Sequence, residues 1–133
     1  MKVTRSIKMK VTRPILWNRT GESFVNRFKV LNKYYYHWPI NVDFHGGLYR
    51  VFDELREIHI ARVGRLVVYH EAIEKRLNDL ASQYLMERIC FKGGDVVVDV
   101  GANVGELGNW FNLRKIKVKY VAIEPSLSEY LAK

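Results

Sequence analysis

The feature that most constrains the fold of this sequence is a run of apolar β-branched residues that leads directly into a glycine-rich turn. Val96 to Val100 holds four valines and Asp99, a pattern typical of strands that are buried on both faces of a parallel sheet. Gly101 and Gly105 follow at a spacing that permits a tight turn into a helix. A strand that turns directly into a helix predicts an α/β fold.

An amphipathic helix of about five turns is predicted before this strand, over Glu71 to Ile89. Apolar residues recur there at steps of three and four, with charged and polar residues between them. The apolar positions are Ala72, Ile73, Leu77, Leu80, Ala81, Tyr84, Leu85 and Ile89. The paired glycines Gly93 and Gly94 then favour a turn over continued helix.

A second helix, from Glu106 to about Asn112, and a second strand, from Lys117 to Glu124, are predicted after the turn. Ser126 and Glu129 have the capping-box spacing that starts a third helix. The order of helix, strand, glycine-rich turn, helix, strand and helix predicts one βαβ half of a doubly wound, Rossmann-like sheet. The predicted core face of the second helix consists of Leu107, Trp110 and Phe111.

Residues 1–70 are predicted to form a separate basic N-terminal extension of α+β character. A hairpin is predicted over Arg56 to His70, with strands at 58–60 and 66–69 joined by a turn at 62–65. Leu48 to Leu55, which follows the break at Gly46 and Gly47, is also compatible with a short helix.

The net charge of +8 lies entirely in the first part of the chain. Residues 1–38 hold nine Lys and Arg against one acid, Glu22, whereas residues 39–133 hold thirteen of each sign. Basic and aromatic residues interleave up to the segment Tyr34 to Trp38, which suits either an anionic partner or a packed aromatic cap with solvated charge around it. Nucleic acid is the less favoured partner, because no helix-turn-helix or RNA-binding signature is present. Eight of the nine basic residues are considered for contact with such a partner: Lys2, Lys8, Lys10, Arg13, Arg19, Arg27, Lys29 and Lys33.

Composition limits the class of protein. With 48% hydrophobic and 27% charged residues in 133, the chain is a globular domain and not a disordered one. The lone Cys90 is predicted to be a small buried residue, and the four histidines share no metal-ligand spacing. No apolar run reaches the ~18 residues of a membrane span and no signal peptide is visible, so we expect a cytoplasmic protein.

Asp99 determines which ligands suit the turn. A dinucleotide fingerprint placed on Gly101 needs glycine at positions 99 and 104, where the sequence has Asp99 and Val104. A phosphate-binding loop is excluded as well, because no Gly-Lys-Ser/Thr follows the turn. A carboxylate favours a ligand with an ammonium group, while Glu124 after the next strand suits a ribose diol. S-adenosylmethionine carries these groups.

Two segments resemble motifs of FkbM-family methyltransferases. The first is Asp-Val-Gly-Ala-Asn-Val-Gly-Glu at 99–106, and the second is Tyr-Val-Ala-Ile-Glu-Pro-Ser at 120–126. The resemblance covers about residues 64–133. It implies that residues 71–133 are the first part of a class I methyltransferase domain that uses S-adenosylmethionine to O-methylate a saccharide or secondary-metabolite hydroxyl. The cofactor-binding residues that it implies are Asp99, Gly101, Asn103 and Gly105 at the methionine end, Glu106 near it, and Glu124 at the ribose.

The chain differs from the family in one respect. Complete members have a seven-stranded sheet, whereas this sequence ends at Lys133, soon after its second predicted strand. No residue is assigned as a catalytic base. We therefore expect that the 133 residues alone are inactive as an enzyme, and that uncovered strands favour self-association.

Each candidate site residue also has a purely structural interpretation. The segment from Asp99 to Gly105 also fits an ordinary strand-to-helix turn without a ligand. Asn103 is a common turn residue, and Glu106 suits the first turn of a helix, where its charge favours the helix dipole. Glu124 also suits a solvated strand end.

Overall fold

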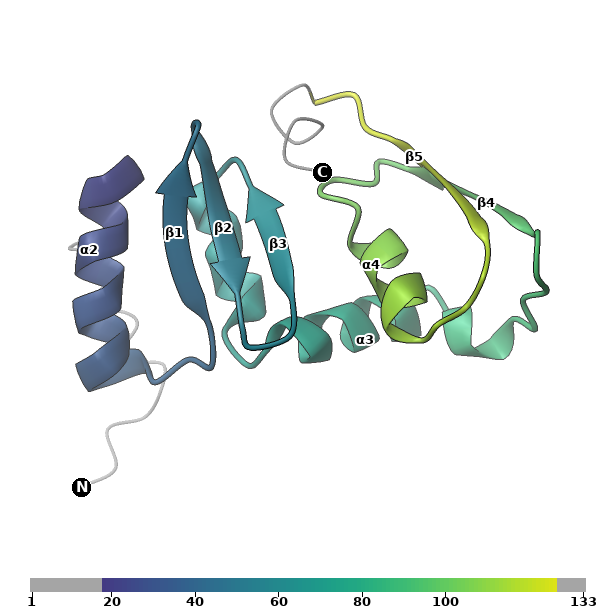
Figure 1. The fold of residues 1–133 in the computed structure, drawn as a ribbon, viewed down its shortest axis with the longest axis horizontal. Helices are drawn as coiled ribbons and strands as arrows, with labels where there is room; N and C mark the ends of the chain where they lie inside the picture. The colour runs from purple at the N-terminus through teal and green to yellow at the C-terminus, as the bar shows by residue number, and fades with distance from the viewer. Residues whose placement is uncertain (1–17, 127–133) are drawn as a thin grey trace.

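The computed structural model of the chain describes residues 18–126. Its fold is mixed α/β, with a three-stranded antiparallel sheet and a separate two-stranded parallel sheet. In Figure 1 the two sheets stand side by side, and helix α3 (Ile73–Gln83) runs along below them. The predicted third helix after Pro125 lies outside the described residues. So do the basic residues Lys2, Lys8, Lys10 and Arg13.

The antiparallel sheet has the strand order β1 (Asn41–His45), β2 (Leu48–Phe52) and β3 (Glu57–Ile60). Gly46 and Gly47 join β1 to β2 with φ values of 58° and 84°, the positive values that a tight hairpin turn requires. Helix α2 (Gly21–Leu31) packs against this sheet and buries Phe24, Val25 and Phe28.

The hairpin predicted over Arg56 to His70 is wrong. β3 pairs with β2 instead, and Asp53 closes the turn between them by accepting hydrogen bonds from the backbone N–H groups of Leu55 and Arg56, both at 2.8 Å. Residues 63–69 form a 3-10 helix, in which Leu66 and Tyr69 are fully buried. The short helix considered for Leu48 to Leu55 is also wrong, because most of that segment is strand β2.

The helix predicted over Glu71 to Ile89 is present but shorter. α3 ends at Gln83, because Leu85 takes a left-handed backbone conformation with φ 55°. A single turn of 3-10 helix, Met86–Arg88, follows. Cys90 is exposed, so its predicted burial is wrong.

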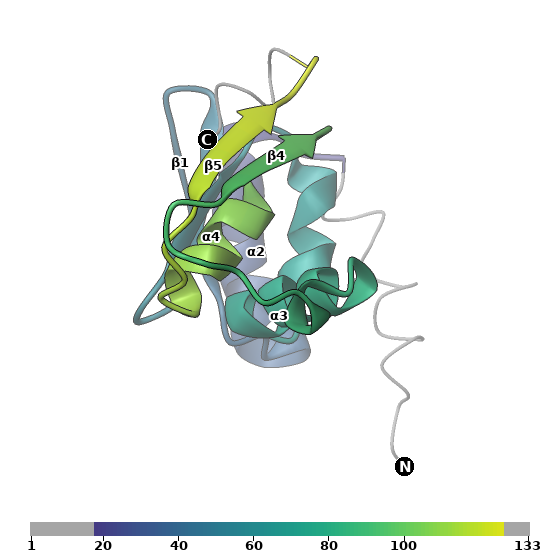
Figure 2. The same ribbon diagram turned by 90° about the vertical axis from the view of Figure 1, so that its right-hand side faces the viewer.

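The strand, turn, helix and strand predicted from residue 96 onward are confirmed. β4 (Val96–Val100) pairs in parallel with β5 (Lys119–Ile123), and α4 (Glu106–Leu113) lies between them in the chain. Figure 2 shows both strands running in the same direction with α4 beside them. The predicted core residues of α4 are all buried: Leu107, Trp110 and Phe111.

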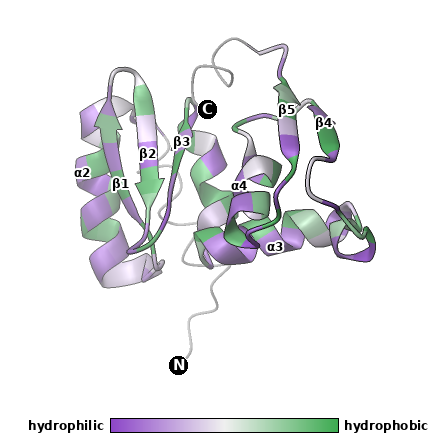
Figure 3. Cartoon of the chain, turned by 45° about the vertical axis from the view of Figure 1, so that its right-hand side comes forward, coloured by the Kyte–Doolittle hydropathy of each residue, from purple (hydrophilic) through white to green (hydrophobic). Residues whose placement is uncertain are grey.

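The two faces of the parallel sheet differ in burial. Val97 and Tyr120 pack against the core on the face that meets α4. The other face is exposed, so the expectation that β4 is buried on both sides is wrong for the described residues. In Figure 3 strand β4 is mostly green, the colour of hydrophobic residues. The exposed apolar residues of this face are Val96, Val98, Val100, Val121 and Ile123. Self-association through this surface stays a prediction.

One hydrophobic cluster extends through most of the described chain. It includes Phe24 of α2, Leu77 of α3 and Trp110 of α4. The antiparallel sheet and the glycine-rich turn are therefore tied together by continuous packing through α3. Within residues 18–126, no helix combines the length and apolar character needed to cross a bilayer.

Candidate functional site

The glycine-rich turn is anchored to the carboxyl end of β5. The backbone N–H groups of Gly101 and Ala102 both donate to the carbonyl oxygen of Ile123, at 2.7 and 3.1 Å. Gly101 and Gly105 have φ values of 78° and 75°, which a side chain would strain. These two glycines let the chain leave β4 and enter α4 within five residues, at the edge where both strands end.

Glu124 is brought to this turn by the parallel pairing of the strands. Its Oε2 atom accepts a hydrogen bond from the backbone N–H of Asn103 at 2.7 Å, and its Oε1 atom accepts one from Ser126 at 2.7 Å. Glu124 and the turn therefore form one site, in which the backbone fixes the carboxylate.

Asp99 lies on the face of β4 that meets α4, and Tyr120 of β5 orients it. The Tyr120 hydroxyl donates to Oδ2 of Asp99 at 2.5 Å. The Tyr120 ring passes so close to Gly108 that a Cβ atom there would lie 2.8 Å from it. Tyr120 and Gly108 were not among the predicted site residues, although Tyr120 alternates onto the same face of the sheet as Asp99.

Glu106 lies inside the protein at the first turn of α4, only 3% exposed. Arg76 of α3 donates to both of its oxygens, from Nε at 2.8 Å and from a terminal nitrogen at 3.0 Å. Arg65 and the Tyr69 hydroxyl each donate to it at 3.0 Å. This carboxylate therefore joins the 3-10 helix, α3 and α4, which an acid that only favours a helix dipole would not do.

Arg65 connects this cluster to the turn. One terminal nitrogen of its guanidinium donates to Oδ1 of Asn103 at 2.9 Å, while the other donates to Glu106. Asn103 takes a left-handed conformation with φ 51°, as a turn residue does, but its side chain and backbone are both hydrogen-bonded. The sequence contains no local signal for Arg65, Tyr69 or Arg76.

The two tyrosines of the site are held un-ionised. Burial raises the pKa of the Tyr69 hydroxyl far above its ordinary value, and the charge of Glu106 raises it further. Burial also raises the pKa of Tyr120, with the hydrogen bond to Asp99 as the next cause. The hydrogen bond to Glu106 raises the pKa of Arg76. All three groups therefore keep their protons at neutral pH, as donors to carboxylates.

We expect the raised pKa of Tyr69 to make the folded protein less stable in alkali. Its stabilising contribution is complete below the ordinary tyrosine pKa of about 10 and is lost as the pH rises above it, by at most about 1.4 kcal/mol per pH unit. Urea unfolding at about pH 9 and pH 11 should show a larger loss of unfolding free energy for the wild type than for Tyr69→Phe. Equal losses would mean that Tyr69 titrates normally in the folded chain.

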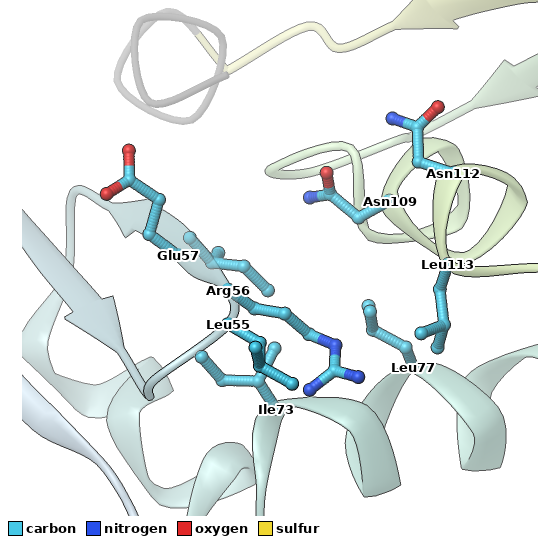
Figure 4. A pocket seen from close by; sticks show the side chains of 9 residues that line it. Leu55, Arg56, Glu57, Ile73, Leu77, Asn109, Asn112 and Leu113 are labelled. Carbon is cyan, nitrogen blue, oxygen red and sulfur yellow. The ribbon is translucent and has the colours of Figure 1, made fainter.

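Two hollows border α4. One has a volume of about 380 Å³ and lies between β3, α3 and α4. In Figure 4 the side chains of Asn109 and Asn112 project from α4 on one side of it, and Glu57 lies on the other. Arg56 contributes to this hollow, but its charge is paired with Glu74 at 2.6 Å. The second hollow, of about 360 Å³, lies between α4 and β5 and includes Gly105.

The basic aromatic segment is partly packed. Trp38 is buried, Tyr36 stacks on it at 5.0 Å between ring centroids, and Tyr34 and Tyr35 are exposed. Lys29 lies 3.7 Å from Asp43. Tyr36 and Trp38 therefore act as a packed cap, while a role of this segment in binding an anionic partner stays a prediction.

Within residues 18–126, no group of three or more His, Cys, Asp or Glu side chains could hold a metal ion. No protein-family model, curated protein or solved structure matches this chain.

Proposed function

We propose that the turn from Asp99 to Gly105, together with Glu124, binds S-adenosylmethionine, and that the chain carries the first part of the cofactor domain of a methyltransferase. The proposed reaction is O-methylation of a saccharide or secondary-metabolite hydroxyl. In this proposal β4 and β5 are neighbouring strands of a doubly wound sheet, and the ligand lies outside their carboxyl ends.

The observation that carries the proposal is the hydrogen bond from the backbone of Asn103 to Glu124. Two acids were predicted from the sequence as parts of one site, and they are 25 positions apart. Asp99 lies near the carboxyl end of β4, and Glu124 directly follows β5. The parallel register brings the ends of those strands together, and the bond fixes Glu124 at the turn. An ordinary strand-to-helix turn does not require an acid from the next strand.

The chemistry of the donor set suits the cofactor. Asp99 keeps one carboxylate oxygen outside its hydrogen bond with Tyr120, and that oxygen can accept from an ammonium group. Glu124 can accept from ribose hydroxyls. Gly101 is exposed and has no neighbouring atom within 4 Å of the position of a Cβ, so a ligand can approach the backbone closely. When bound, S-adenosylmethionine supplies an electrophilic methyl group on its sulfonium; the residues of this chain bind and orient it.

Calorimetric titration of the full chain with S-adenosylmethionine tests the proposal. We expect the wild type to bind, and Asp99→Ala and Glu124→Ala each to lose about a hundredfold or more in affinity, because each loses charge-assisted hydrogen bonds. Glu57→Gln is the matched control, since Glu57 is an exposed acid on β3 outside the site. The proposal fails if the wild type does not bind, or if the two alanine variants bind as well as Glu57→Gln.

A further inference from the structure

The cluster around Glu106 carries more positive than negative charge. Two guanidinium groups, those of Arg65 and Arg76, share one carboxylate, and their side chains are only 22% and 20% exposed. Asp79 acts on Arg76 as a weaker and more distant charge, and it forms its own ion pair with Lys75. One positive charge thus lacks a close counter-charge in the described cluster, which is costly for partly buried groups.

The two arginines are not equivalent. Arg76 makes a bidentate pair with Glu106, so its charge is well matched. Arg65 shares its donors between Glu106 and the uncharged amide of Asn103, and its Nε atom is buried without a hydrogen-bond partner. The unmatched charge is therefore centred on Arg65, which lies directly against the glycine-rich turn.

We infer that Arg65 binds the carboxylate of the methionine moiety of S-adenosylmethionine. This inference rests on the proposed function and deepens it by assigning the one anionic group of the cofactor. The guanidinium of arginine presents five N–H donors in a planar fork that matches a carboxylate, and its charge does not depend on pH. Arg65 thereby selects ligands that carry an amino acid end over ligands that carry only the nucleoside.

The charges of the site complement the whole ligand. Asp99, Glu106 and Glu124 contribute three negative charges, while Arg65 and Arg76 contribute two positive charges, which leaves a net charge of −1. S-adenosylmethionine carries an ammonium, a sulfonium and a carboxylate, so its net charge is +1. In this assignment Asp99 accepts from the ammonium group and Arg65 donates to the carboxylate, the two opposite charges that a zwitterionic amino acid group requires.

The test compares two ligands that differ by a single group, S-adenosylmethionine and its decarboxylated analogue. We expect the wild type to bind the first about tenfold to a hundredfold more tightly, the effect of one charge-assisted hydrogen-bonded pair. In Arg65→Gln the two affinities should become nearly equal. Arg65→Lys keeps the charge beside Glu106 but not the planar pair of donors, so its ratio of the two affinities should be intermediate. This variant replaces Arg65→Gln if the latter does not fold.

Arg76→Gln is the matched control, since it disturbs the same cluster without removing the group that touches Asn103. Its ratio of affinities should equal that of the wild type even if its stability falls. An arginine that acts only by positioning Asn103 would lower both affinities equally and leave the ratio unchanged, which overturns the inference. A wild type that binds both ligands equally overturns it too. A wild type that binds neither ligand overturns the proposed function itself.

Discussion

We expect Glu106→Leu to lower the unfolding free energy of this protein by about 3–5 kcal/mol, the usual result of removing one partner from a buried ion pair. The carboxylate accepts four hydrogen bonds from Arg65, Arg76 and Tyr69. Its loss leaves two guanidinium groups without their carboxylate in a partly buried site. It also leaves the buried hydroxyl of Tyr69 without its acceptor. Because most domains have only about 5–15 kcal/mol of stability, this change removes a large share of it.

Urea denaturation followed by circular dichroism measures this effect. The matched control is Glu74→Gln, which removes an exposed acid bonded to Arg56 at 2.6 Å and should cost at most about 1 kcal/mol. A second variant changes the whole cluster to apolar groups: Arg65→Met, Tyr69→Phe, Arg76→Met and Glu106→Leu together. It should recover at least half of the lost stability, because no buried charge is left unpaired. A Glu106→Leu protein as stable as the control would contradict this account of the cluster.

Trp110→Ala should cost about 3–5 kcal/mol, as truncation of a large buried aromatic side chain does. Trp110 is 2% exposed, and its ring meets that of Phe111 at 5.2 Å between centroids. Its indole Nε1 atom is buried without a hydrogen-bond partner, so Trp110→Phe removes an unsatisfied donor as well as some contact area. We expect the Phe variant to lose only about 1–2 kcal/mol.

Thermal and urea unfolding of both variants separates the contribution of the ring contacts from that of the indole N–H. Val98→Ala, on the exposed face of β4, is the control. The control should change the unfolding free energy by less than about 0.5 kcal/mol. If Trp110→Phe were as unstable as Trp110→Ala, the indole N–H would have to contribute stability, and its environment would differ from the one described.

The part of the fold that sequence reasoning predicted well is the part with strong local signals. The valines of β4 favour a strand, and the glycines at 101 and 105 permit a left-handed turn. Both effects act within a few residues, so they can be predicted directly from the sequence. The segment 63–69 shows the opposite case. Leu66 to Tyr69 has a strand-like composition. The two residues of this segment that are buried, Leu66 and Tyr69, are three positions apart, however, and three residues is the period of a 3-10 helix.

The candidate site divides in the same way. Asp99 and Glu124 were predicted because each lies at the carboxyl end of a predicted strand, where parallel pairing gathers side chains. Asn103 was implied by the resemblance of the turn at 99–106 to a known motif. Arg65 and Arg76 were missed because their partner, Glu106, is 41 and 30 positions away. No periodicity or motif in the sequence predicts a contact between residues so far apart along the chain.

The environment of Asn103 has a consequence for how the site forms. Its backbone is held by Glu124 and its side chain by Arg65, residues 21 and 38 positions away in opposite directions along the chain. The turn acquires its bonded geometry only after both distant segments have docked, so an intermediate in which either one is detached has no assembled site. A ligand that binds there binds only the fully folded state, so its binding free energy adds to the stability of the whole chain.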